Sequence, residues 1–347
     1  MFAEQMKAAP VNGGFKMDGY WVWCPSVIKG DDGRYHMFAS RWKKSLPMHP
    51  GWLVASEIVR AIATRPEGPY EFQEVVLPAR GPAYWDGRST HNPSIMKVDD
   101  TYLLYYMGTT HPFSDVNEKD GLTLDDPRTI VARANKRIGL ATAPSLTGPW
   151  QRMVTPILTT RPDKFDNFLV SNPAPMMEAD GQVLMIYKCR SYKEDLSQRF
   201  LQSPTMAFGV ARAKSYDQAY IQQLDSSVFR KGIDVEDPFL WEADKTYHMI
   251  AKDMKGSICG EASGGFYATS EDGTTWDLKQ GVLAYSKKVL WDDGIVREMG
   301  NMERPFILFE EGQATHMFFA TSDSVDGGGI MTCNNTWNMV IPLEEKG

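Results

Sequence analysis

Three carboxylates in this sequence stand just before prolines that open apolar runs. Glu236 and Asp237 are the two residues before Pro238, and Glu303 stands two residues before Pro305. Carboxylates that share a pocket can divide two tasks. One, held protonated, assists a leaving oxygen, while another, ionised, activates water or attacks carbon. If the fold brings these motifs together, their residue types favour the cleavage of a glycosidic bond.

These two motifs belong to a set of five. The prolines that open the apolar runs are Pro25, Pro93, Pro173, Pro238 and Pro305. Successive prolines are 68, 80, 65 and 67 residues apart. Five similar intervals indicate that one structural unit has been used five times, and equivalent positions of such units converge on one axis.

Each unit consists of short strands separated by turns. For example, residues 102–106 follow the turn Asp99-Asp100, and residues 139–143 precede a Gly-Pro turn and Trp150. Aromatic and β-branched runs between acidic or glycine-containing turns are hairpin signals. We therefore expect an all-β fold, a five-bladed β-propeller of four-stranded antiparallel blades, with residues 1–347 as one catalytic domain. A sandwich or an α/β barrel would not explain the period.

The longest interval, between Pro93 and Pro173, contains a polar insertion. We expect residues 111–136 to form a surface loop with a helical turn near Asp126-Pro127. Loops of this length often carry function.

The repeat aligns two sets of residues at the start of the innermost strands. The residues directly before the prolines are Cys24, Asn92, Asn172, Asp237 and Arg304. The residues one position earlier are Trp23, His91, Ser171, Glu236 and Glu303. Asn and Asp before proline also favour turns, so a purely structural role stays open for each residue. Three carboxylates, a His and an Arg at aligned positions nevertheless favour a site at one mouth of the channel.

Other side chains of suitable chemistry could also line this end of the central channel. Arg41, Lys188 and Lys252 end the second strands, where they either enter the cavity or are ordinary solvated cations. Inside the cavity they would suit a sugar bearing a carboxylate or sulfate, or would lower carboxyl pKa values. Asp86, just before the second motif, could also reach in. Aromatic residues that could stack on sugar faces are Trp23, Trp42, Trp85 and Tyr106.

The motifs Asp237-Pro238 and Glu303-Arg304-Pro305 resemble those of the five-bladed β-propeller glycoside hydrolases of families 43, 32, 62 and 117. The blade pattern extends this resemblance over nearly the whole chain. The resemblance implies that Glu303 is the general acid and that Asp237 orients it and modulates its pKa. The first catalytic Asp of these families would fall at Asn92, in His91-Asn92-Pro93.

Asn cannot act as a base, so the identity of the base stays open among His91, Asp86 and Glu236. In an alternative register Glu236 is the acid and Cys24 takes the position of the base. The candidate catalytic residues are thus Glu303, Asp237, Glu236 and His91. The candidate substrate-binding residues are Trp23, Arg41, Asp86, Asn92, Asn172, Lys188, Lys252 and Arg304.

Three functions are compatible with these features. The leading prediction is an exo-acting glycosidase for oligosaccharides derived from plant, algal or microbial polysaccharides, including those with an acidic sugar. The second is a phosphorylase similar to family 130, in which phosphate, bound by Arg41, Lys188 and Lys252, replaces the base. The third is a carbohydrate-binding propeller that has lost catalysis along with the first Asp.

The composition of the chain restricts the classes of molecule that the protein is expected to bind. The net charge of −7 and the lack of a basic block argue against nucleic acid, and no apolar run is long enough for a membrane span. The four cysteines form no CxxC pair, so no zinc site is expected. No cofactor is required, although a structural calcium would be compatible.

The N-terminus has no apolar signal region, so we expect a cytoplasmic protein, or a periplasmic or secreted one if a signal has been removed. The oligomeric state stays open.

Overall fold

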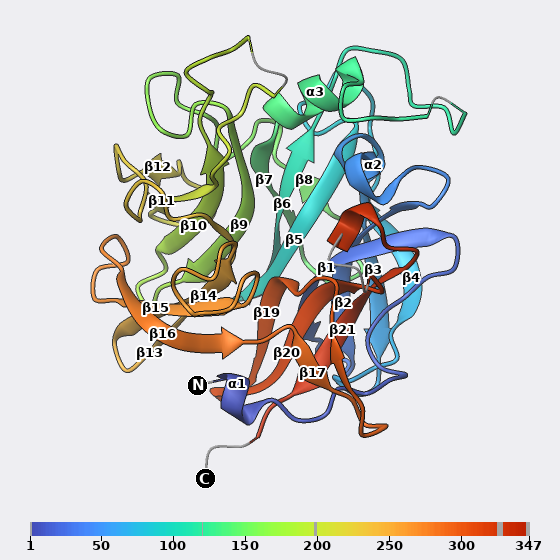
Figure 1. Ribbon diagram of the computed structural model, residues 1–347, viewed down its shortest axis with the longest axis vertical. Coiled ribbons are helices and arrows are strands. Elements are labelled where there is room, and N and C mark those ends of the chain that lie inside the picture. Colours follow the sequence, from blue (N-terminus) through green and yellow to red (C-terminus); the bar gives the residue numbers. More distant parts are fainter. Residues whose placement is uncertain (1, 120, 198–199, 325–328, 345–347) are drawn as a thin grey trace.

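Five β-sheets stand around a central axis in the computed structural model, which describes residues 2–119, 121–197, 200–324 and 329–344 (Figure 1). The innermost strands of the five sheets contact one another in a closed ring. The predicted all-β fold, a five-bladed β-propeller, is confirmed.

Four blades have four antiparallel strands each, in chain order from the axis outward. Blade 1 contains β1 (Tyr20–Lys29), β2 (Tyr35–Lys43), β3 (Glu57–Ala63) and β4 (Glu71–Leu77). Blade 2 contains β5 (Ser89–Val98), β6 (Thr101–Thr109), β7 (Arg137–Ala143) and β8 (Gln151–Arg152). Blade 3 contains β9 (Leu169–Met177), β10 (Val183–Arg190), β11 (Ala207–Ala213) and β12 (Ile221–Gln222). Blade 4 contains β13 (Val235–Ala243), β14 (Thr246–Asp253), β15 (Gly265–Ser270) and β16 (Asp277–Tyr285).

The fifth blade is closed by both ends of the chain. Its regular strands are β19 (Glu303–Glu310), β20 (Gln313–Ser322) and β21 (Thr336–Pro342), preceded by the hairpin of β17 (Lys288–Leu290) and β18 (Val296–Glu298). The N-terminal segment lies along the outer edge of β21, where Phe15 and Asn338 exchange two backbone hydrogen bonds of 2.8 and 2.9 Å. The N-terminal segment thereby supplies part of the fourth position of this blade.

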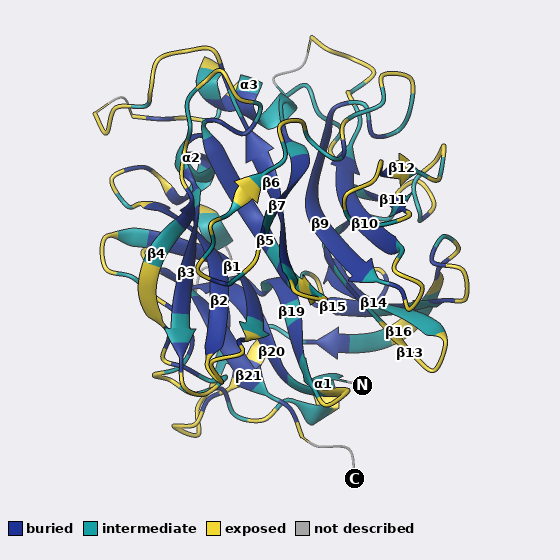
Figure 2. Cartoon of the chain, turned by 180° about the vertical axis from the view of Figure 1, so that it is seen from behind, coloured by how far each residue is buried: buried dark blue, intermediate teal, exposed yellow. Residues whose placement is uncertain are grey.

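Among the described residues, five of the apolar core clusters each lie between two neighbouring blades. Alternate residues of a strand face opposite neighbours, as the two-residue period of a strand requires. On β14, Met249 and Ala251 pack toward blade 3, whereas Ile250 packs toward blade 5. Figure 2 shows the result, with buried strands inside and exposed loops at the rim.

Each innermost strand has a β-bulge at its proline motif. All five residues before the prolines have φ between 49° and 57°, namely Cys24, Asn92, Asn172, Asp237 and Arg304. Asn and Asp tolerate positive φ, but for Cys24 and Arg304 this backbone geometry is strained. A bulge redirects a side chain out of the regular alternation, and here it occurs five times around one axis.

Two helices cover one mouth of the propeller. The predicted helical turn near Asp126-Pro127 is present as α3 (Pro127–Ala134), where the Asp126 side chain caps the N-terminus by accepting from Arg128 N. It packs against α2 (Met48–Ala55) through Leu53, Val54 and Ala132. The remaining short helices are α1 (Phe2–Gln5) and η1 (Gly329–Met331). No helix in the described part of the chain has the length and apolar character of a membrane span.

Asp86 has a structural position inside blade 2. Its side chain is fully buried and accepts hydrogen bonds from Arg80 Nε and from the Tyr106 hydroxyl, both at 2.7 Å. Asp166 has the same arrangement in blade 3, with Arg161 and Tyr187. The repetition indicates an ion pair that holds the loop before the innermost strand of blades 2 and 3. Asp86 is therefore not brought into the central pocket, contrary to its assignment as a substrate-binding residue.

The buried position of Asp86 predicts a large loss of stability when its charge is removed. We expect Asp86→Asn to lower the free energy of unfolding by about 3 kcal/mol, because the substitution leaves the partly buried guanidinium groups of Arg80 and Arg152 without their counter-charge. Urea denaturation measures this loss. Asp100→Asn, in the exposed turn after β5, is the control and should change stability by less than about 0.5 kcal/mol. Equal effects of the two substitutions would contradict the structural role.

Candidate functional site

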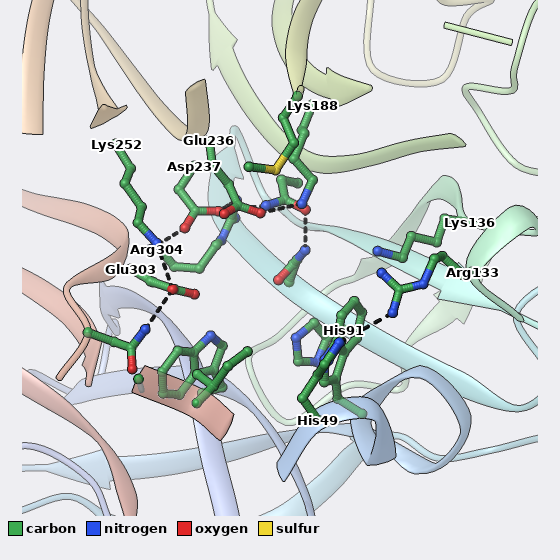
Figure 3. Close-up of a pocket in the computed structure, with 18 of the residues that line it drawn as sticks. His49, His91, Arg133, Lys136, Lys188, Glu236, Asp237, Lys252, Glu303 and Arg304 are labelled. Carbon is green, nitrogen blue, oxygen red and sulfur yellow. Dashed lines mark hydrogen bonds and ion pairs between the residues drawn. The ribbon is translucent and has the colours of Figure 1, made fainter. Parts of the chain in front are cut away.

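A pocket of about 390 Å³ opens at the mouth of the axis. It lies where the innermost strands begin and the second strands end, and α2, α3 and η1 contribute to its rim. Figure 3 shows charged side chains from several blades pointing into it. Its volume is at the small end of the range for ligand pockets, about 300–1,000 Å³.

The floor of the pocket is a chain of hydrogen bonds between the five residues that precede the prolines. The Cys24 thiol donates to Asn92 Oδ1 at 2.9 Å, and Asn92 Nδ2 donates to Asn172 Oδ1 at 2.7 Å. Asn172 Nδ2 then donates to Asp237 Oδ1 at 2.5 Å. From the other side, the backbone N–H of Arg304 donates to Asp237 Oδ2 at 2.9 Å. Every donor in this network leads to one acceptor, the Asp237 carboxyl.

This direction of donation explains why position 92 carries an amide. A carboxylate there could not donate to Asn172, whereas the Asn92 amide accepts from Cys24 and donates onward. Asn92 therefore has a structural role in the floor. The missing base must be found elsewhere in the pocket.

Two glutamates stand above the floor, each paired with a lysine from the preceding blade. Lys188 Nζ bonds Glu236 Oε1, and Lys252 Nζ bonds Glu303 Oε1 at 2.7 Å. Asn301 Nδ2 also donates to Glu303 Oε1 at 2.9 Å. The Oε2 atoms of both glutamates have no protein partner among the described residues. Two carboxylates of neighbouring blades thus each present one free oxygen to the same pocket.

The surroundings of Glu236 and Asp237 shift the pKa values of these two carboxyl groups in opposite directions. Burial opposes ionisation of Glu236, but the charges of Lys188 and Lys252 outweigh it and lower the pKa of Glu236 to about 2. Burial, together with the negative charge of Glu236, raises the pKa of Asp237 to about 6. Glu236 is therefore ionised at neutral pH, while Asp237 keeps its proton to a higher pH than an ordinary Asp does.

An aromatic wall lies on the side of blades 1 and 2. It contains Trp23, Trp42 and Trp52, and the ring of Trp52 stacks on His91 with centroids 4.8 Å apart and planes at 22°. His91 Nδ1 lies 2.9 Å from Ser56 Oγ, and its Nε2 lies 3.5 Å from Cys24 Sγ. Burial and the nearby charge of Lys136 keep the pKa of His91 well below its usual range. His91 thus lines the pocket as a neutral ring with both nitrogens engaged.

A cationic wall of Arg133, Lys136, Lys188 and Arg190 lines the pocket, and Figure 3 shows Arg133 and Lys136 across from Glu303. Arg133 comes from α3 and donates to His49 Nε2 at 3.3 Å, while Arg190 donates to the Ser203 carbonyl at 2.8 Å. Burial, with the charges of Arg133 and Lys136, lowers the pKa of His49 to about 3. These cations have no carboxylate at ion-pair distance among the described residues, except for Lys188, which bonds Glu236.

Most residues assigned from the sequence meet in this pocket. The residues that line it are Trp23, His91, Asn92, Asn172, Lys188, Glu236, Asp237, Lys252, Glu303 and Arg304. Arg41 does not, because its guanidinium pairs with Glu57 at 2.9 Å and lies over the rings of Tyr20 and Phe72. Of the other aromatic candidates, Trp42 lines the pocket, whereas Trp85 and Tyr106 stack on each other inside blade 2.

Several pocket residues were not predicted. Those from the loops are Met48, His49, Trp52, Arg133, Lys136, Met206, Met254, Asn301, Gly329 and Ile330. Their positions follow no repeat, so alignment of the blades could not find them. The one usable signal was the long interval between Pro93 and Pro173, whose insertion supplies Arg133 and Lys136. Within the described residues, no three His, Cys, Asp or Glu side chains are grouped to hold a metal.

The raised pKa of Asp237 predicts a particular dependence of stability on pH. The pKa is about 6 in the fold against an ordinary value of 3.8, so between these values the folded protein keeps a proton that the unfolded chain has lost. The contribution of this group to the free energy of unfolding therefore falls as the pH rises through that window. Relative to Asp237→Asn, we expect the unaltered protein to lose on the order of 2 kcal/mol between about pH 4 and pH 6.5. Urea denaturation at both pH values measures this, and a difference that does not decrease would contradict the raised pKa.

Comparison with solved structures shows which known proteins share this fold. No protein-family model and no curated protein matches the sequence. Among solved structures, the family 117 glycoside hydrolase Zg3597 of the marine bacterium Zobellia galactanivorans matches with a TM-score of 0.68 and 13% identity, over 98% of this chain and 90% of that chain. A thermostable family-43 glycoside hydrolase matches with a TM-score of 0.60 and 12% identity, over 98% and 94%. A GH43_1 enzyme of Xanthomonas citri complexed with xylotriose matches with a TM-score of 0.54 and 15% identity, over 95% and 89%. The chain thus has the five-bladed fold of these glycoside hydrolase structures.

Proposed function

We propose that this protein is a glycoside hydrolase whose acid and base are Glu303 and Glu236. The observation that carries the proposal is the pair of free Oε2 atoms that these glutamates present to one pocket, each with its other oxygen held by a lysine. The fold shared with hydrolases of families 117 and 43 supports it.

The roles follow by elimination. Asp86 is buried in blade 2, and both ring nitrogens of His91 contact protein groups, so Glu236 is the remaining candidate for the base. Its low pKa keeps it ionised, as a base or nucleophile requires. Glu303 then donates its proton to the leaving oxygen as the glycosidic C–O bond breaks, while Glu236 takes a proton from the water that attacks the anomeric carbon. Asp237, below them, modulates the charge of the cluster.

The shape of the pocket favours action at the end of a glycan. The hydrogen-bonded floor closes the axial channel below, and α2, α3 and residues 329–330 border the mouth above. A pocket with a closed floor accepts a chain end rather than the middle of a chain. The tryptophans of the aromatic wall give that side of the pocket an apolar surface that suits a sugar ring. We therefore assign exo-action on an oligosaccharide.

Replacement of the acid gives a diagnostic pattern of activities. We expect Glu303→Gln to lower kcat on 4-nitrophenyl glycosides by about 10²–10⁴-fold, because the leaving oxygen is no longer protonated. The loss should be much smaller on 2,4-dinitrophenyl glycosides, whose leaving group needs little protonation. Steady-state kinetics on the sugar that the unaltered protein hydrolyses measures both. Glu310→Gln, at the far end of β19, is the matched control. Equal losses on the two leaving groups would contradict the role of Glu303 as acid.

Phosphorolysis is the rival reaction, and the cationic wall is the observation that favours it. A phosphate bound by Arg133, Lys136 and Arg190 would attack the anomeric carbon in place of water. The ionised Glu236 at the same pocket makes such an acceptor unnecessary, so we expect hydrolysis without added phosphate. Product analysis with and without inorganic phosphate separates the two. A glycosyl phosphate product with turnover that requires phosphate would contradict hydrolysis.

A further inference from the structure

The pocket carries more positive charge than its own carboxylates balance. Six cations line it, namely Arg133, Lys136, Lys188, Arg190, Lys252 and Arg304, against the three carboxylates Glu236, Asp237 and Glu303. The whole chain has the opposite sign, with a net charge of −7. A local excess of cationic side chains in an acidic protein attracts an anionic ligand.

Lys136 is the strongest evidence that the excess positive charge of the pocket serves to bind a ligand. Its side chain is 3% exposed, and its Nζ lies 4.3 Å from the centroid of the Trp52 ring, with no carboxylate at ion-pair distance among the described residues. A buried cation without a counter-charge destabilises a fold. Burial and the charges of Lys188 and Arg133 also hold the pKa of Lys136 well below its usual range. An anion at this position would supply the missing partner.

The cations are not spread evenly. Lys188 and Lys252 are neutralised by glutamates, and Arg304 lies against Asp237. The unbalanced charge is therefore concentrated in Arg133, Lys136 and Arg190, and Figure 3 shows the first two on the side away from Glu303. In the same wall, the Trp52 ring stacks on His91 and has the Lys136 amine over it. A cation cluster beside aromatic side chains matches a sugar that bears an anionic substituent.

We propose that Arg133, Lys136 and Arg190 recognise a carboxylate or sulfate group on the sugar ring that occupies the pocket. This inference rests on the proposed glycosidase function for the identity of the ligand as a sugar. It assigns the substrate class as an anionic glycan, and it makes these three residues specificity determinants rather than catalytic residues.

Binding can be tested without turnover, so the result does not depend on the catalytic assignment. The probes are glucuronate, galacturonate and glucose 6-sulfate, with glucose and galactose as neutral counterparts, at constant ionic strength. Thermal denaturation and calorimetric titration measure the shift in Tm and the Kd. We expect at least one charged sugar to stabilise the unaltered protein in a dose-dependent way, with at least tenfold lower Kd than its neutral counterpart.

Lys136→Met keeps the apolar stem and removes the charge. We expect it to weaken binding of the charged sugar at least tenfold and to raise the Tm of the free protein, because a buried uncompensated charge is removed. A merely structural lysine would show a lower Tm instead. Arg133→Gln is the second variant, and Lys97→Met, whose amine pairs with Asp31 at the surface, is the control. Neither the Tm nor the Kd should change substantially in the control.

Three outcomes would overturn the inference. In the first, no charged sugar binds better than its neutral counterpart. In the second, Lys136→Met and Arg133→Gln bind charged sugars as well as the unaltered protein does. In the third, inorganic phosphate stabilises the protein as strongly as any charged sugar does, which would identify a free oxyanion as the ligand. Hydrolysis of neutral glycosides alone, with loss of activity in Glu303→Gln, would leave the glycosidase assignment standing without this inference.

Discussion

The rest of the structure depends on the network of hydrogen bonds that crosses the axis and ends on Asp237. Each member precedes a proline, has positive φ and lies in a bulge. The bulge turns that side chain into the axis to form the floor, while the preceding residue contributes to the wall above. One backbone feature, used five times, therefore builds both the closed end of the channel and the positions of Glu236 and Glu303.

Charge in the site is distributed between blades rather than within them. Lys188 of blade 3 holds Glu236 of blade 4, and Lys252 of blade 4 holds Glu303 of blade 5. The position of each glutamate side chain therefore depends on the packing of two sheets. The ring of sheets closes where β1 contacts β19 and β21, and the N-terminal segment pairs with the outer edge of β21.

The fold and the floor of the site could be predicted because the proline period and the turn residues are local features that fix equivalent positions. The failures have a common cause. Alignment places a backbone position but not the direction of its side chain, so Arg41 was expected in the pocket although it pairs with Glu57. Asp86 was misassigned because its partners, Arg80 and Tyr106, come from outside the motif. Arg133 and Lys136 belong to a loop insertion that has no counterpart in the other blades.

The most direct test of the central claim is a crystal structure of Glu303→Gln with an oligosaccharide bound. The account predicts that the side-chain amide of residue 303 lies within hydrogen-bond distance of the glycosidic oxygen. It also predicts that Glu236 lies beside the anomeric carbon on the face opposite that bond. A glycan bound in this pocket with its glycosidic oxygen out of reach of residue 303, or with Glu236 away from the anomeric carbon, would contradict the assignment.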